Sequence, residues 1–149
     1  MMMEAGRITG EALLVAREHV REGVSTKELD TLIRAYIEKC GAKPSFLGYG
    51  GFPGSACISI NDEVIHGIPS KKRILLEGDI VKIDTGAFYK GFNSDMARTF
   101  AVGSVSHLNT HDFSDLTQGK ILIVTKIKIF LLLIRKHSAV VVKEQNGLN

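Results

Sequence analysis

The most constraining feature of the sequence is a strand–turn–strand pattern. The segments Ile80–Phe88 and Phe92–Val102 flank the dipeptide Lys90-Gly91, which is typical of a two-residue hairpin loop. With that loop, the numbers of facing residues add up to 181. Asp84 and Asp95 are then diagonal neighbours on one face of the sheet, with β-carbons about 7 Å apart.

Two carboxylates placed in this way are candidate metal ligands. Their neighbours in the hairpin are apolar: Ile83, Phe88, Met96 and Phe100. Burying both charges there is costly unless a divalent cation offsets their repulsion, and two metal ions about 3.5–4 Å apart can also activate a water molecule. The alternative is that this face is open to solvent and both aspartates are hydrated. A one-residue change in the loop would place them on opposite faces.

Two helices are predicted before the strands. Residues from about Glu4 to Glu22 carry a stripe of helical period made of Leu13, Leu14, Ala16, Arg17 and Val20. Ser25 to Glu28 form a capping box at the start of a second helix, and Gly41 stands where a left-handed residue ends it. Ala56–Ile60 reads as a further strand. A helical pair followed by several strands predicts an α+β fold.

Three further positions could contribute to a site. His66 lies in an apolar stretch before Gly67, where a lone histidine is more often a hydrogen-bonded structural residue than a catalyst. A loop rich in glycine and aromatic residues holds Tyr49 and Phe52 and leads to Cys57. Core packing is the default interpretation of these three residues, and the rim of a pocket is the alternative.

Charge and cysteine content limit the classes of function. Residues 1–106 carry 13 Lys and Arg against 13 Asp and Glu, so no basic face for nucleic acid is expected. Cys40 and Cys57 are too few for a disulfide framework, which favours the cytoplasm. The sequence has neither an N-terminal secretory signal nor an apolar run long enough to span a bilayer, so no membrane partner is expected.

The composition and the hydrophobic pattern of the sequence change near residue 106. All three prolines and 13 of the 15 glycines precede that point, and Ile121–Ile134 fits neither strand alternation nor a helical stripe. We therefore expect residues 1–106 to be the part of the chain that belongs to a mixed α/β domain. The remainder, residues 107–149, is expected to be an atypical tail that is either frame-shifted or disordered. His107 and His111, four residues apart, are better explained by a loop than by a metal site.

Seven segments in order resemble the N-terminal half of type I methionine aminopeptidase, the cytosolic metallopeptidase with the pita-bread fold. The resemblance runs from Glu4 to about Ser104 and rests on Glu4–Ile8, Gly23–Asp30, Gly48–Pro53, Cys57–Asn61, His66–Pro69, Glu77–Asp84 and Asp95–Phe100. It implies a partial pita-bread (creatinase/aminopeptidase-like) fold, with two N-terminal helices packed on an antiparallel sheet.

The resemblance also implies a role for each candidate residue. Asp84 would chelate one metal ion and Asp95 would bridge two. His66 would contact the scissile amide and assist proton transfer. The side chain of the substrate methionine would contact Tyr49, Phe52 and Cys57, with His66 beside them.

By the same resemblance, a metal-bound hydroxide would remove the N-terminal methionine of nascent proteins near the ribosome. The ions would be cobalt, manganese, iron or zinc, two for each complete site.

The sequence departs from the family pattern at three of five expected metal ligands. The family adds a histidine and two glutamates to the two aspartates, whereas only Glu144 follows Glu77 here. We therefore expect a chain of these 149 residues to be inactive or nearly so as a hydrolase. The alternative is a non-catalytic pita-bread module that binds a peptide or a protein. A proline-specific relative is disfavoured by the segments at 48–53 and 57–61.

Overall fold

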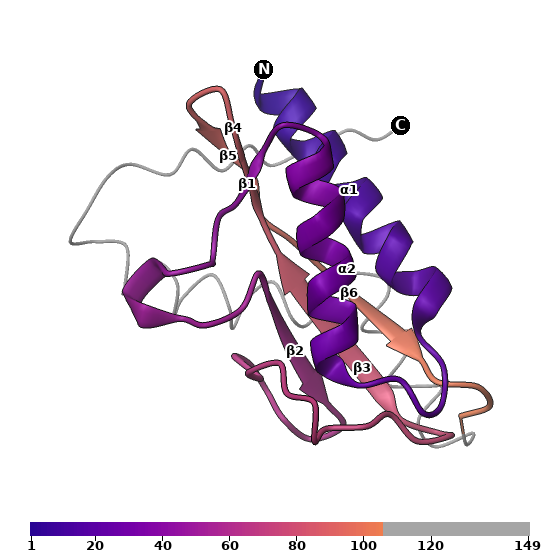
Figure 1. The fold of residues 1–149 in the computed structure, drawn as a ribbon. Coiled ribbons are helices and arrows are strands. Elements are labelled where there is room, and N and C mark those ends of the chain that lie inside the picture. The colour runs from indigo at the N-terminus through magenta and orange to yellow at the C-terminus, as the bar shows by residue number, and fades with distance from the viewer. Residues whose placement is uncertain (106–149) are drawn as a thin grey trace, which may run out of the picture. The chain divides into compact units, whose positions relative to one another are not determined.

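The computed structural model describes residues 1–105. The atypical tail expected at residues 107–149 lies outside this part of the chain. Two helices precede most of the strands (Figure 1). In chain order the elements are α1 (Met2–His19), α2 (Thr26–Lys39), β1 (Lys43–Pro44), the 3₁₀ turn η1 (Tyr49–Gly51), β2 (Ala56–Ile60), β3 (Ile80–Thr85), β4 (Ala87–Tyr89), β5 (Phe92–Asn93) and β6 (Met96–Ala101).

The strands of residues 1–105 form two antiparallel sheets. One has the order β2-β3-β6 and the other the order β1-β4-β5. Helices α1 and α2 lie side by side over the β2-β3-β6 sheet (Figure 1). The predicted arrangement, two helices packed on an antiparallel sheet, is therefore what the structure shows.

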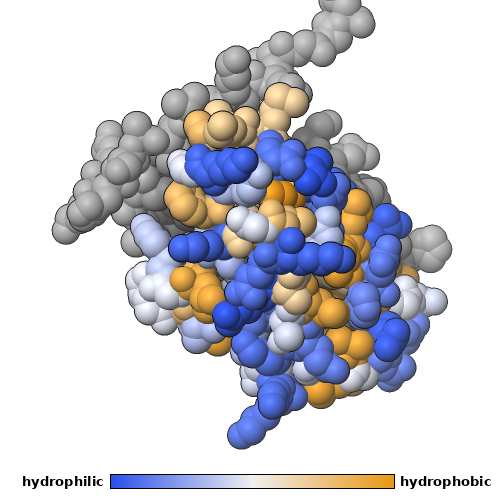
Figure 2. Space-filling view, turned by 45° about the horizontal axis from the view of Figure 1, so that its top comes forward, coloured by the Kyte–Doolittle hydropathy of each residue, from blue (hydrophilic) through white to orange (hydrophobic). Residues whose placement is uncertain are grey.

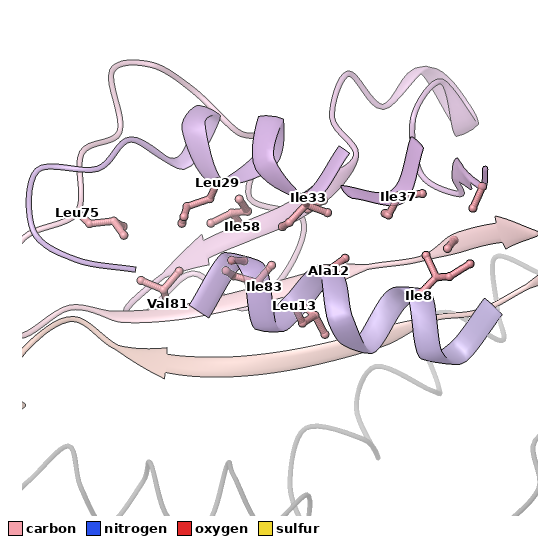
Figure 3. Close-up of a cluster of buried hydrophobic side chains, with 14 of the residues drawn as sticks. Ile8, Ala12, Leu13, Leu29, Ile33, Ile37, Ile58, Leu75, Val81 and Ile83 are labelled. Atoms are coloured by element: carbon pink, nitrogen blue, oxygen red, sulfur yellow. The ribbon is translucent and has the colours of Figure 1, made fainter. Parts of the chain in front are cut away.

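The core lies between the helices and the β2-β3-β6 sheet (Figure 3). The residues of strand β3 show that the two faces of the sheet differ in burial. Val81, Ile83 and Thr85 are fully buried, whereas Lys82 and Asp84 are only half-buried. Since successive side chains of a strand point to opposite faces, the helices cover one face and Asp84 belongs to the other.

Helix α2 begins and ends as its sequence predicts. The side chain of Ser25 accepts a hydrogen bond from the backbone N–H of Glu28, and the Glu28 carboxylate accepts one from the N–H of Ser25. At the other end Gly41 has φ +72°, and the N–H of Ala42 donates to the carbonyl of Ile37 at 3.2 Å. This is a Schellman motif.

Helix α1 differs from the prediction, because it ends at His19 rather than Glu22, and because Leu14 and Arg17 of the predicted stripe are exposed. Leu13 is fully buried, but Leu14 is 44% exposed. The buried face is instead extended toward the N-terminus by Ala5, Ile8, Thr9 and Ala12.

The hairpin has the predicted register but not the predicted continuity. Every pair in β3–β6 and β4–β5 adds up to 181, and Lys90 and Gly91 have φ values of +47° and +89°. Pairing is interrupted at Gly86, where a β-carbon would lie 2.3 Å from the carbonyl oxygen of Ser94. The two long strands are therefore each divided, and the outer half of the ribbon joins the β1-β4-β5 sheet.

The surface in view mixes charged and apolar side chains (Figure 2). Several large apolar residues of the described chain stay exposed, among them Tyr49, Val64, Ile68 and Leu76. Within residues 1–105, no helix has the length and apolar character needed to cross a membrane.

Candidate metal and substrate site

Asp84 lies in the middle strand of the β2-β3-β6 sheet, on the face turned away from the helices. Its neighbours across the sheet are Cys57 in β2 and Ala97 in β6. Cys57 is buried and Ala97 is exposed. The strand pairing therefore brings two of the predicted site residues, Asp84 and Cys57, side by side.

Asp95 lies one residue before β6 and is exposed. Extending the register of β3–β6 by one residue places it opposite Gly86, diagonal to Asp84. This is the backbone position that the hairpin register predicts. Its role as a metal ligand stays a prediction.

The residue before Asp95 fixes the ribbon to helix α1. The hydroxyl of Ser94 donates to the carbonyl oxygen of Ala5 at 2.9 Å and is hydrogen-bonded to the hydroxyl of Thr9. The backbone N–H of Ser94 donates to the carbonyl of Ala87 at 3.0 Å. Asp95 therefore follows a point at which the strand is fixed to the helical layer.

His66 lies in the segment between β2 and β3, beside the outer edge of β2. The N–H of Ile58 donates to the carbonyl of Gly67 at 2.8 Å, and the N–H of Gly67 donates to the Ser59 hydroxyl at 3.2 Å. The His66 side chain is exposed and its backbone has φ +58°. A left-handed backbone is uncommon outside glycine, although histidine is among the residues that adopt it.

The three predicted pocket residues differ in exposure. Cys57 is buried, Phe52 is half-buried and Tyr49 is 69% exposed. Core packing, the default interpretation, is thus wrong for Tyr49, because the 3₁₀ turn η1 carries its ring outward. The role of these residues in binding a substrate stays a prediction.

Sequence reasoning missed a buried carboxylate that holds the start of β2. Asp30 of α2 is 2% exposed, and its Oδ1 accepts hydrogen bonds from the N–H groups of Ser55 at 2.6 Å and Ala56 at 3.1 Å. Its Oδ2 accepts one from Lys27 Nζ at 2.7 Å. The available signal was an acidic residue next to Leu29 on the apolar face of the predicted helix.

Side-chain hydrogen bonds shift pKa values where α1 meets α2. The hydroxyl of Tyr36 donates to the carboxylate of Glu11 at 2.6 Å, which raises the pKa of Tyr36 to about 12 and lowers that of Glu11. The Arg7 guanidinium lowers the pKa of Glu4. The bond between Tyr36 and Glu11 joins the two helices, whereas Glu4 and Arg7 both belong to α1. All four groups lie on the helical layer, which covers the opposite face of the sheet from Asp84.

Asp84 and Asp95 offer carboxylate oxygens, which suit divalent cations such as manganese and zinc. Among residues 1–105, however, no group of three or more His, Cys, Asp or Glu side chains is arranged so that it could hold a metal ion. The described residues therefore fit part of a metal site, and a complete coordination shell needs further ligands.

Comparison with known proteins gives a consistent picture. The chain is 54% identical over 105 residues to a methionine aminopeptidase of Clostridium acetobutylicum, and 48% identical over 106 residues to methionine aminopeptidase 1 of Bacillus subtilis. These matches cover 70% and 71% of this chain. The chain spans 42% of the length of each of these two relatives.

Comparison with solved structures leads to the same family of proteins as the sequence comparison. Methionine aminopeptidase from Rickettsia prowazekii matches with a TM-score of 0.72 and 39% identity, over 74% of this chain and 44% of that one. Prolidase from Pyrococcus furiosus matches with a TM-score of 0.64 and 30% identity, over 74% and 31%. The resemblance to methionine aminopeptidases and the partial pita-bread fold are thereby confirmed.

A family model extends the match further along the sequence than the pairwise comparisons do. The model of metallopeptidase family M24 covers residues 1–127. Enzymes of such a family use divalent metal ions, in agreement with the paired carboxylates on the β3–β6 ribbon. The family model matches well over half of the 149 residues of this chain. The chain therefore belongs to metallopeptidase family M24.

Proposed function

We propose that this chain carries the aspartate-bearing part of an aminopeptidase site that removes N-terminal methionine from nascent proteins. The observation that carries the proposal is the pairing of Asp84 with Cys57, with Asp95 on the diagonal. The names of the most similar relatives support the same activity.

In this proposal Asp84 and Asp95 hold the metal through their carboxylate oxygens. A complete site takes two divalent ions, drawn from cobalt, manganese, iron or zinc, because carboxylate-rich sites select poorly among them. When bound, such an ion polarises a carbonyl group and lowers the pKa of water. Three further ligands, a histidine and two glutamates, are needed to complete the site.

The remaining residues of the site bind and orient the substrate. Tyr49, Phe52 and Cys57 receive the methionine side chain, for which an apolar pocket discriminates by roughly 1–3 kcal/mol per methylene. His66 contacts the scissile amide and carries a proton to or from it. The exposure of Tyr49 and His66 is compatible with direct contact to a substrate.

The setting proposed for this activity is the cytoplasm, near the ribosome, where nascent N-termini appear. The chain has two cysteines, Cys40 and Cys57, which are too few for a disulfide framework, and this fits a reducing compartment. No nucleic acid and no membrane is included among the partners.

A second candidate is a non-catalytic module that binds a peptide or a protein. It is favoured by the fact that residues 1–105 contain no group of three or more His, Cys, Asp or Glu side chains that could hold a metal ion. The module keeps Tyr49, Phe52 and His66 as binding residues and does not need a metal.

Isothermal titration calorimetry with the 149-residue chain separates the two candidates. The peptide is Met-Ala-Ser, titrated in manganese chloride and again after treatment with a chelator. The aminopeptidase site predicts manganese uptake, and peptide binding that depends on manganese. Peptide binding of equal strength without metal would favour the module, and the absence of both manganese and peptide binding would contradict the aminopeptidase proposal.

The matched variants are Asp84→Asn and Asp62→Asn. Asp62 is exposed, in the turn after β2, and is not part of the proposed site. The aminopeptidase site predicts that only the change at Asp84 reduces manganese uptake.

A further inference from the structure

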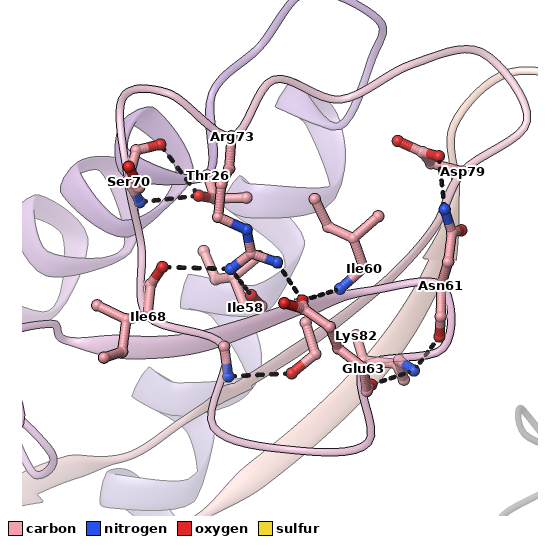
Figure 4. Close-up of polar contacts among 12 residues, drawn as sticks. Thr26, Ile58, Ile60, Asn61, Glu63, Ile68, Ser70, Arg73, Asp79 and Lys82 are labelled. Atoms are coloured by element: carbon pink, nitrogen blue, oxygen red, sulfur yellow. Dashed lines mark hydrogen bonds and ion pairs between the residues drawn. The ribbon is translucent and has the colours of Figure 1, made fainter.

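Arg73 joins three parts of the segment that carries His66 (Figure 4). Its Nη1 donates to the carbonyl oxygen of Ile58 at 3.1 Å and to that of Ile68 at 3.2 Å. Its Nη2 forms an ion pair with the carboxylate of Glu63. One guanidinium thus connects β2 to the chain on both sides of His66.

Further contacts hold the two ends of the same segment. The carboxylate of Glu63 accepts a hydrogen bond from the N–H of Ile60 at 2.8 Å, and Lys82 Nζ donates to the carbonyl of Glu63 at 2.6 Å. At the other end the N–H of Ser70 donates to the Thr26 hydroxyl at 2.9 Å. Residues 63–70 are therefore fixed to β2, β3 and α2.

Gly67, the residue after His66, has no room for a side chain. A β-carbon on Gly67 would lie 2.0 Å from the carbonyl oxygen of Ile58, the same oxygen that accepts from Arg73. His66 itself has a left-handed backbone, which persists only where surrounding contacts determine it. The Arg73 side chain is 26% exposed, and its hydrogen bond to the carbonyl of Ile58 is partly buried.

We propose that Arg73 is a positioning residue for His66. Its planar fork of donors holds the carbonyl groups of Ile58 and Ile68 together with the Glu63 carboxylate, and thereby presents an exposed imidazole from a rigid backbone. Lysine cannot replace this fork, because an ammonium group is a compact point charge on a flexible stem. The functional meaning of this positioning rests on the proposed role of His66.

The test compares Arg73→Lys with Arg34→Lys in the full chain. Arg34 forms an exposed ion pair with Glu38 on α2, so its replacement is a matched change of arginine to lysine outside the segment. Two measurements by NMR report on positioning: the hydrogen exchange rate of the Ile58 amide, which donates to Gly67, and the imidazole signals of His66. The amide of Ile33, buried in α2, reports on global stability.

We expect Arg73→Lys to accelerate exchange at Ile58 by about tenfold and to shift or broaden the His66 signals, with Ile33 unchanged. Arg34→Lys should change none of these. Glu63→Gln, which removes the ion pair, should act in the same direction as Arg73→Lys. Unchanged His66 signals in Arg73→Lys, or equal acceleration at Ile58 and Ile33, would overturn the proposal.

A double-mutant cycle separates this inference from the proposed function. If Arg73 acts through His66, the loss of Met-Ala-Ser affinity caused by Arg73→Lys should disappear in a His66→Ala background. If His66→Ala itself leaves peptide affinity unchanged, the proposed role of His66 fails, while the NMR measurements still decide whether Arg73 positions it. An undiminished effect of Arg73→Lys in the His66→Ala background would contradict action through His66.

Discussion

Gly67 is the residue at which the packing around the candidate site leaves the least room. A β-carbon there would lie 2.0 Å from backbone oxygen and 2.9 Å from the α-carbon of Ser59. Backbone cannot move aside as the end of a side chain can. The segment that carries His66 can therefore approach β2 only with glycine at this position.

Replacing Gly67 by alanine should lower the free energy of unfolding by about 1–3 kcal/mol, because the segment must move away from β2. The control is Gly6→Ala in α1, where nothing lies within 4 Å of the added carbon. That change should raise stability by about 0.5–1 kcal/mol, since alanine restricts the unfolded chain. Urea unfolding measures both. Equal stability of Gly67→Ala and the unaltered chain would show that the close approach is absent in solution.

Asp30 is the second residue on which the site depends without belonging to it. Replacing Asp30 by alanine leaves the N–H groups of Ser55 and Ala56, both in buried residues, without their acceptor. Each such loss costs about 1–3 kcal/mol, so we expect a loss on the order of 3 kcal/mol in urea unfolding. Glu38→Ala, in an exposed pair on the same helix, should cost less than about 1 kcal/mol. Similar costs for the two variants would contradict this account.

Helix α2 is the element whose ends the sequence determines most completely. The capping box at Ser25 and the left-handed Gly41 both follow from local residue types. Replacing Ser25 by alanine should destabilise the protein by about 1 kcal/mol, because the N–H of Glu28 loses its side-chain acceptor. Thr31→Ala, on the exposed face of the same helix, should be neutral or stabilising. Thermal unfolding compares the two, and an equal effect would argue against the cap.

The same cap predicts a dependence on pH. Hydrogen bonds from the Ser25 hydroxyl and backbone hold the pKa of Glu28 below its usual value. A carboxyl group with a lowered pKa stabilises the fold above the pKa of the unfolded chain, and this stabilisation is lost as the pH falls through the folded value. Glu28→Gln should therefore reduce the loss of stability on acidification below about pH 4.5. An acid unfolding profile identical to that of the unaltered chain would contradict the prediction.

At the scale of helices and strands, local sequence patterns predicted those features that are determined by residues close together in the chain. The register of the hairpin followed from Lys90-Gly91, and β2 from the run Ala56–Ile60. The interruption at Gly86 and Ser94 could not be predicted in this way. It depends on contacts with α1, whose partners Ala5 and Thr9 are more than 80 residues away in the chain.

At the scale of the whole molecule, the residues of the candidate site are held in position in different ways. The position of Asp84 follows from strand alternation, whereas the position of His66 depends on Arg73, Glu63 and Lys82. No spacing rule relates those three residues, so sequence reasoning found the histidine but not its support. Tyr49 was assigned to the core by default because residue type alone cannot show that a turn carries a ring outward.

The incomplete set of ligands also leads to a prediction for the whole chain. Two aspartates cannot hold two metal ions by themselves, and only Glu144 follows Glu77 in the sequence. We therefore expect the 149-residue chain to release methionine from Met-Ala-Ser no faster than cobalt or manganese alone, as measured by quantifying free methionine. Turnover above the metal-only control that is abolished by Asp84→Ala would show that the remaining ligands come from elsewhere in this chain or from a second copy.

Asp84 and Asp95 share one side of the β3–β6 ribbon, where we propose that they hold a divalent cation. Paramagnetic broadening of amide NMR signals by manganese ions tests it most directly. The account predicts broadening centred on Asp84 and Asp95, extending to their neighbours Cys57 and Ala97, which is lost in Asp84→Asn and kept in Asp62→Asn. Broadening centred on other residues, or unchanged by Asp84→Asn, would contradict it.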